Sequence, residues 1–141
     1  MIVVSSCLAG VNSRFDGSSS PCQRVIDLVR EGQAIPVCPE QLGGLPTPRP
    51  AAERRGELVL TPDGQDVTDE FRRGAEEALR IAQLAGCREA ILKSDSPSCG
   101  SGRIHDGTFS GGFVDRDGVF AELLKQHGVK VLTEHDVCAQ S

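Results

Sequence analysis

The chain has no tryptophan or tyrosine and only five phenylalanines, so aromatic residues make up 4% of its 141 residues. This scarcity argues against a protein that stacks nucleic-acid bases on an aromatic platform. Twenty acidic residues against fifteen basic ones give a net charge of −5 and no general attraction to phosphate backbones or anionic membranes. The chain also lacks a CxxC pair and an apolar run of membrane-spanning length. These absences exclude a zinc ribbon, a ferredoxin-like cysteine run and a transmembrane helix.

The composition that remains is typical of a globular domain. Hydrophobic residues make up 38% of the chain and charged residues 25%, and 141 residues is close to the commonest domain size. We therefore expect one domain over residues 1–141. Six residues precede Cys7, too few for a signal peptide, so we expect a cytoplasmic protein with no membrane partner. In that reducing compartment the six cysteines are expected to stay free and not to form three disulfides.

Short apolar runs alternate with amphipathic segments along the chain. The pattern predicts strands at 2–5, 34–37, 89–93 and 129–133, and helices at 23–31, 68–85 and 119–126. Glycine- and proline-rich stretches at 9–21, 39–50 and 94–112 are predicted to be irregular, and 57–61 a small excursion before a turn. The alternation predicts an α/β fold of the Rossmann-like, three-layer type, with a mostly parallel sheet between two layers of helices.

Three of the six cysteines follow predicted strands. Cys7, Cys38 and Cys99 come after the first, second and third strands, so their thiols are expected at the carboxyl ends of the strands, where open α/β sheets bind ligands. Three thiolates there suggest a metal centre with one open coordination position, as a catalytic metal requires. The other three cysteines, Cys22, Cys87 and Cys138, do not share this placement and are interpreted as packing or incidental thiols.

The loops around two of these cysteines carry further polar groups. Glu40 lies two residues after Cys38, and the glycines at 43 and 44 could turn backbone N–H groups toward an anionic centre. Ser96 and Ser98 place two hydroxyls beside Cys99. Glu40 could instead cap a helix start, and Ser96 could be an ordinary turn hydroxyl.

Several motifs together strongly resemble the DUF523 family, which includes thiouracil desulfurases (desulfidases) and relatives that act on 4-thiouridine. They are CLAG at 7–10, RFDG at 14–17, PVCPEQLGGLPTPRP at 36–50, DVT at 66–68, SPSCG at 96–100 and HDGTF at 105–109. The resemblance spans nearly the whole chain in order. One departure is Ser13, where many members carry a further cysteine.

The resemblance implies an oxygen-sensitive [4Fe-4S] cluster held by Cys7, Cys38 and Cys99, with one iron not ligated by protein. That iron would take the sulfur of a thiocarbonyl substrate, and hydrolysis would give the oxo compound and sulfide without net redox change. Glu40 would act as general base or proton shuttle, and Ser96 would orient water or substrate. The implied substrates are thiolated pyrimidine bases or nucleosides, such as 2- or 4-thiouracil and 4-thiouridine.

Two other interpretations stay open. The first is a tRNA 4-thiouridine desulfidase, for which Arg54-Arg55 and Arg72-Arg73 are the only basic clusters, although we interpret them as exposed faces. The second is a non-catalytic metal- or redox-sensing module, in which the three thiols bind zinc or an oxidation-labile cluster.

Four further residues have two interpretations each. Asp95 is either a proton-transfer aid or a solvated loop acid, and His105 beside Asp106 is either half of a catalytic pair or a residue that points away from its neighbour. Arg14 and Arg49 either hold a pyrimidine carbonyl or a phosphate, or form ordinary ion pairs.

Overall fold

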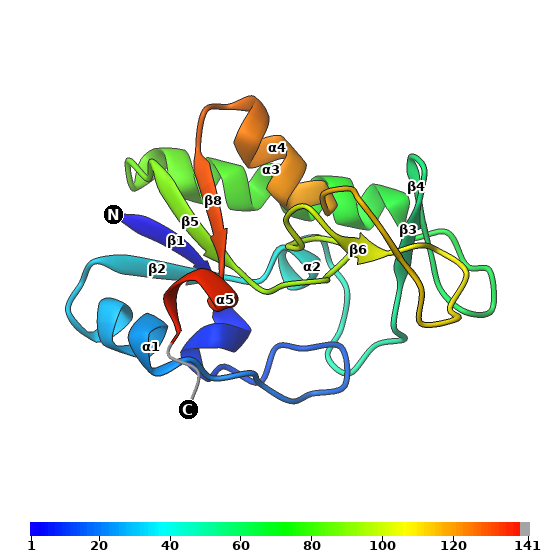
Figure 1. Ribbon diagram of the computed structural model, residues 1–141, viewed down its shortest axis with the longest axis horizontal. Helices are drawn as coiled ribbons and strands as arrows, with labels where there is room; N and C mark the ends of the chain where they lie inside the picture. Colours follow the sequence, from blue (N-terminus) through cyan, green and yellow to red (C-terminus); the bar gives the residue numbers. More distant parts are fainter. Residues whose placement is uncertain (139–141) are drawn as a thin grey trace.

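The computed structural model describes residues 1–138, which form a parallel sheet with helices on both faces (Figure 1). The strands are β1 (Ile2–Ser5), β2 (Ala34–Val37), β5 (Glu89–Leu92) and β8 (Lys130–Thr133), in the spatial order β2-β1-β5-β8. All three pairings are parallel. The four strands match the predicted ones to within one residue at each end, and the predicted α/β class is confirmed.

Successive side chains of β1, which lies inside the sheet, point to opposite faces. Val3 is fully buried against the layer formed by α3 (Thr68–Leu84) and α4 (Val119–Gln126), together with Ala90. Val4, its neighbour, is fully buried on the other side with Val25 of α1 (Gln23–Arg30). A strand buried on both faces has no polar face, which is why the predicted strands appear as short continuous apolar runs. The result is the expected three-layer arrangement, with α3 and α4 on one face and α1 on the other (Figure 1).

Two small antiparallel hairpins lie outside the main sheet. The first pairs β3 (Glu53–Arg55) with β4 (Leu58–Leu60), and the second pairs β6 (Ile104–His105) with β7 (Phe113–Val114). The prediction that 94–112 is irregular throughout is therefore wrong at β6. The segment 57–61, predicted as a small excursion before a turn, contains β4, the second strand of the first hairpin. These strands are two or three residues long, too short to show an alternating pattern.

A one-turn helix, α2 (Pro39–Leu42), corrects the prediction of irregular structure at 39–50. Pro39 is in the first helical position, where its fixed φ suits a helix and its missing N–H costs nothing. Gly43 at its end packs against Gly74 of α3 so closely that a Cβ on either glycine would collide with backbone atoms of the other helix segment. This contact fixes α2, and the residues that it carries, against the long helix.

The carboxyl-terminal segment departs furthest from expectation. After β8 the chain forms α5 (Glu134–Val137), which begins with a capping box at Thr133, and Cys138 forms a disulfide with Cys22, with 6.0 Å between their Cα atoms. The expectation that all six thiols stay free is therefore wrong for this pair. The contact is tertiary: Cys22 lies 116 residues earlier in the chain, and both residues pack in the cluster that includes Val25.

We expect Cys138→Ser to lower the free energy of unfolding by about 2–4 kcal/mol, because the disulfide restricts the unfolded chain over a long loop. Urea unfolding with and without a dithiol reductant measures this effect. The wild-type protein and Cys87→Ser should lose stability when the reductant is added, and Cys138→Ser should not. Equal stability of the wild-type protein in both conditions would contradict the expectation.

None of the helices within residues 1–138 is long and apolar enough to span a membrane.

Candidate active site

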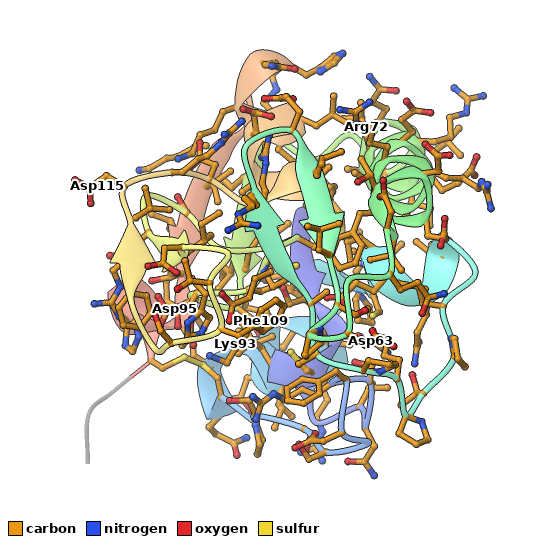
Figure 2. All side chains as sticks on the ribbon, turned by 90° about the vertical axis from the view of Figure 1, so that its right-hand side faces the viewer. Asp63, Arg72, Lys93, Asp95, Phe109 and Asp115 are labelled. Carbon is orange, nitrogen blue, oxygen red and sulfur yellow. A yellow bond between two sulfur atoms is a disulfide. The ribbon has the colours of Figure 1, made fainter. Side chains whose placement is uncertain are left out.

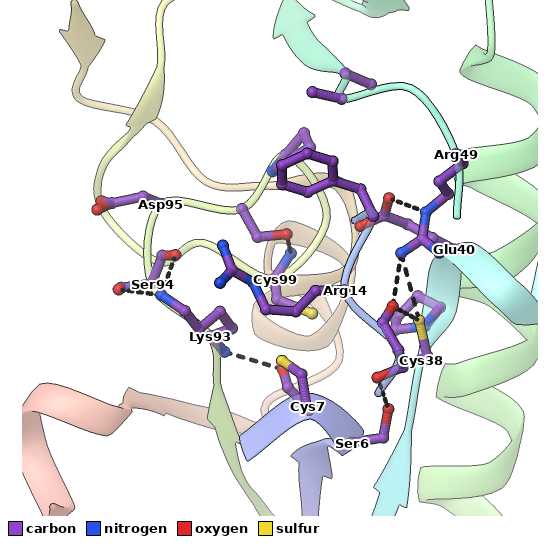
Figure 3. Close-up of a pocket in the computed structure, with 18 of the residues that line it drawn as sticks. Ser6, Cys7, Arg14, Cys38, Glu40, Arg49, Lys93, Ser94, Asp95 and Cys99 are labelled. Atoms are coloured by element: carbon purple, nitrogen blue, oxygen red, sulfur yellow. Dashed lines mark hydrogen bonds and ion pairs between the residues drawn. The ribbon is translucent and has the colours of Figure 1, made fainter. Parts of the chain in front are cut away.

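A pocket of about 360 Å³ opens at the carboxyl ends of β1, β2 and β5. It brings together five residues from the three segments that follow these strands, namely Cys7, Cys38, Glu40, Ser96 and Cys99. Figure 3 labels all of them except Ser96. These are the five residues that the sequence analysis singled out as the candidate site. Their convergence follows from the sheet, because parallel strands deliver the segments after them to the same edge.

Each thiol is positioned by a different local structure. Cys7 lies in η1 (Ser6–Ala9), the single turn of 3-10 helix that directly follows β1. Cys38 is the residue before α2, in an extended conformation that ends β2. Cys99 follows the loop after β5, where Ser96 Oγ accepts hydrogen bonds from the backbone N–H groups of Ser98 (3.1 Å) and Cys99 (3.0 Å). Short, locally fixed segments hold all three thiols.

Burial dominates the electrostatics of the thiols. Loss of solvation raises the pKa of Cys7 to about 11, although the nearby Lys93 ammonium acts in the opposite direction. Burial also raises the pKa values of Cys38 and Cys99 above the usual range, and for Cys99 the neighbouring thiols add to the shift. Without a compensating positive charge the three groups are protonated thiols at neutral pH. A metal centre held by these residues would have to displace the thiol protons.

A single metal ion does not fit this donor set. Within residues 1–138, no three His, Cys, Asp or Glu side chains are placed so that they could hold one ion. A polynuclear cluster differs because each thiolate binds a different iron, so the sulfur atoms need not converge on one point. In Figure 3 the thiols of Cys7, Cys38 and Cys99 lie around one space and do not meet at a point.

Glu40 lies in the first turn of α2 and forms an ion pair with Arg49, with 3.0 Å between Oε1 and Nε. Arg49 is 8% exposed, and its guanidinium also donates to the Ser13 carbonyl at 2.9 Å and to Thr47 Oγ1 at 2.8 Å. Burial raises the pKa of Glu40 above its usual value even though the Arg49 charge opposes the shift. Arg49 therefore forms an ion pair, one of the two interpretations that the sequence left open.

The hydroxyl of Ser96 has a restricted role in this geometry. Its oxygen already accepts two backbone N–H groups, which occupies its acceptor capacity and leaves the O–H hydrogen available. Because Ser96 borders the pocket, this hydrogen can be donated to a ligand there. Ser96 thus shapes the turn that carries Cys99, as an ordinary turn hydroxyl would, and still has one donor for the pocket.

Three polar residues that the sequence analysis did not select form a network beside Cys7. The Lys93 ammonium pairs with Glu134 at 2.9 Å, and Ser94 donates from its N–H (2.8 Å) and its hydroxyl (2.9 Å) to the same carboxylate. Burial opposes ionisation of Glu134, but the bonds from Lys93 and Ser94 outweigh it, so the pKa of Glu134 lies below its usual value. The sequence signal for Lys93 was its place directly after β5. No sequence pattern indicated Glu134, which lies in α5 and reaches the site only in the folded chain.

Other predicted features are placed as follows. His105 borders the pocket, whereas Asp106 turns away to accept hydrogen bonds from Thr108, so the two do not form a catalytic pair. Asp95 borders the pocket and pairs with Arg103 through two contacts of 3.1 Å. Lys93 and Asp95 are labelled in Figure 2, which views the molecule from the right-hand side of Figure 1. Arg14 borders the pocket, with its guanidinium 5.9 Å from the ring of Phe15.

Three further expectations meet different outcomes. The Gly43 and Gly44 N–H groups bond to carbonyls of Pro39 and Gln41, so they cap α2 and do not face an anionic centre. Arg54, expected on an exposed face, is buried and paired with Glu122 at 3.0 Å, while Arg55, Arg72 and Arg73 are exposed. Ser13 is buried at the pocket, and its hydroxyl lies 2.6 Å from that of Ser6.

The site is thus a pocket at the carboxyl edge of an α/β sheet, lined by three free thiols, a buried carboxylate and a serine hydroxyl. The chain belongs to the 2-thiouracil desulfurase family, which it matches over residues 2–136. It is 44% identical to the uncharacterized protein YbbK of Bacillus subtilis (strain 168), over 97% of each chain. It is also similar to the solved structure of the [4Fe-4S]-dependent thiouracil desulfidase TudS, with a TM-score of 0.92 and 49% identity. That match covers 96% of this chain and 91% of the other.

Proposed function

We propose that this protein is a [4Fe-4S]-dependent enzyme that hydrolyses thiolated pyrimidines, such as 2-thiouracil, 4-thiouracil or 4-thiouridine, to the oxo compound and sulfide. The observation that carries the proposal is the convergence of Cys7, Cys38 and Cys99 on one pocket. Its support is the likeness to TudS, which is named a [4Fe-4S]-dependent thiouracil desulfidase. We also propose a cytoplasmic location, where a reducing environment preserves an oxygen-sensitive cluster.

The donor set fits such a cluster. Cys7, Cys38 and Cys99 would hold it, because they line the pocket, whereas Cys22, Cys87 and Cys138 do not. Three cysteines for four irons leave one iron without a protein thiolate. Bound there, the cluster would supply a thiophilic Lewis acid, which suits the soft sulfur of a thiocarbonyl.

Glu40 would move the protons of the hydrolysis, because it lines the pocket beside the thiols. The reaction adds the oxygen of water to the ring carbon and transfers two hydrogens to the departing sulfur, so no electrons are gained or lost. In its ionised form the Glu40 carboxylate would take one proton from the attacking water and deliver it to the sulfur as the C–S bond breaks. The second proton would leave the hydroxyl of the adduct as the C=O bond forms, and the same carboxylate would pass it to the sulfur. The Arg49 ion pair at 3.0 Å holds the carboxylate in one orientation for this transfer.

Ser96 and Arg14 would orient the substrate. Because the oxygen of Ser96 already accepts two N–H groups, its hydroxyl donates and does not accept, so it would bond to a carbonyl oxygen or to the oxygen of water. Arg14 borders the same pocket and would donate to the remaining carbonyl of the pyrimidine.

The alternative functions have less support. Binding of tRNA requires a basic surface, but the net charge is −5 and Arg54, half of one predicted basic cluster, is buried in an ion pair. A zinc-binding sensor requires ligands that converge on one ion, and residues 1–138 offer no such set. A sensor with an oxidation-labile cluster would use the same three thiols, but the similar protein TudS is named a desulfidase. We therefore favour a free base or nucleoside as the substrate and an enzyme over a regulator.

The test compares sulfide release by anaerobically reconstituted protein from free thiopyrimidines and from thiolated tRNA across a series of salt concentrations. We expect release from at least one of 2-thiouracil, 4-thiouracil and 4-thiouridine, with little dependence on salt. Uracil and uridine should compete poorly, because a carbonyl oxygen is a hard, weak ligand for thiolate-bound iron. Faster turnover on tRNA that collapses as salt rises would favour the tRNA enzyme. No release from any thiocarbonyl by cluster-loaded protein would favour the sensor.

A further inference from the structure

His105 is a pocket residue for which the proposed reaction has no role. It lies on β6, which is outside the main sheet, and its side chain borders the same pocket as the three thiols. Neither ring nitrogen makes a hydrogen bond within residues 1–138, and Nδ1 is buried without a partner. A buried polar atom without a partner loses its bonds to water and gains nothing in return, so such atoms are rare and each calls for an explanation.

The imidazole is held in place by stacking. Its ring lies 4.8 Å from the Phe113 ring at an interplanar angle of 26°, and the two residues face each other across the β6–β7 hairpin. The Arg103 guanidinium lies 4.0 Å from the Phe113 ring centre, and Arg103 is paired with Asp95, the residue before Ser96. Aromatic stacking and cation–π contacts fix the plane of a ring without using its polar atoms. His105 is thus oriented, while both of its nitrogens stay unused.

The chemistry of a neutral imidazole matches the edge of a thiopyrimidine. Imidazole has one donor and one acceptor, and 2-thiouracil has ring N–H donors and a carbonyl acceptor in addition to its thione. Under the proposed function, the cluster held by the three thiols would recognise the sulfur of the thione. The remaining polar edge needs partners from the protein, and His105 borders the pocket from a different segment than the three thiols.

We propose that His105 is a substrate-binding residue that hydrogen-bonds the polar edge of the pyrimidine and so selects thiopyrimidines over other thiones. This inference rests on the proposed function and names a specificity residue of that site. The residue acts on binding, so its loss raises KM and leaves kcat nearly unchanged.

His105→Phe is the sharpest variant, because phenylalanine keeps the stacking on Phe113 and removes both nitrogens. We expect KM for 2-thiouracil to rise about threefold to tenfold, as for the loss of one hydrogen bond in a partly buried site. Pyridine-2-thione keeps the C=S group but lacks the second ring N–H and the carbonyl. Its inhibition constant against 2-thiouracil should be the same in the wild-type protein and in His105→Phe.

His127→Phe is the matched control, because His127 is exposed at the end of α4 and should leave both constants unchanged. His105→Gln keeps a donor and an acceptor without the ring, so it should recover part of the loss. An unchanged KM for 2-thiouracil in His105→Phe, or an equal loss for pyridine-2-thione, would overturn the proposal. So would failure of both His105 variants to bind the cluster, measured by iron content, because the residue would then be structural.

Equilibrium dialysis with 2-thiouracil in a Glu40→Gln background, where hydrolysis is slowed, measures the same contact apart from turnover. In that background we expect weaker binding with His105→Phe than with His105 intact, by the same factor as the change in KM. If the cluster-loaded wild-type protein releases no sulfide, the proposed reaction fails, whereas the dialysis still decides whether His105 binds the pyrimidine. Equal binding by both proteins would refute the role of His105 alone.

Discussion

Cys7→Ala, Cys38→Ala and Cys99→Ala should each abolish cluster binding. The three thiols come from three different segments and enclose one pocket, so no neighbouring cysteine can replace a lost ligand. Wild-type protein reconstituted without oxygen should be brown, with about four irons per chain and a broad absorption in the blue. The variants should be colourless. Iron and sulfide analysis together with a visible spectrum measures the difference.

Cys87→Ser is the matched control for these variants. Cys87 is as buried as Cys7, at 8% exposure for both, but it lies at the other edge of the sheet. It should keep the full iron content, as should Cys22→Ser, whose thiol is bonded to Cys138. Any pocket variant that keeps about four irons would remove that cysteine from the ligand set.

Glu40→Gln should keep the cluster spectrum and slow sulfide release by roughly a hundredfold or more, the usual contribution of a general acid or base. Glutamine has nearly the same shape and can still contact Arg49, but it cannot carry the proton. Ser96→Ala should also keep the cluster and lower turnover, less severely, because it removes one donor to the pocket. A variant that binds no iron would show that the residue holds the cluster or its loop.

The pH dependence separates proton transfer from a structural effect. Burial raises the pKa of Glu40, and a general base works only when it is deprotonated. Wild-type turnover should therefore fall as the pH drops through this raised pKa, at a higher pH than an ordinary glutamate would give. Glu40→Gln should lose this acid limb, whereas Glu76→Gln, on the exposed face of α3, should keep both the limb and the rate. An acid limb that survives in Glu40→Gln would assign it to another group.

The sequence alone was sufficient for the main sheet and for the positions of the thiols. Strands of a parallel sheet covered by helices are mostly apolar, so short runs such as Ile2–Val4 and Ala34–Val37 are visible without any tertiary information. Parallel strands then place the residues after them at one edge, so Cys7, Cys38 and Cys99 could be assigned to a common site from their positions alone.

Only the tertiary structure decided which groups surround those thiols. Arg49 pairs with Glu40, Lys93 with Glu134, and Cys22 with Cys138, in each case through the approach of segments that no local pattern connects. The second hairpin brings His105 to the pocket, although its strands are too short for a periodic signal. Local periodicity reports how a segment faces the core, whereas pairing between distant side chains depends on where the folded chain places them. For that reason the sequence determined the sheet and the candidate ligands, and the fold determined the charges and hydrogen bonds around them.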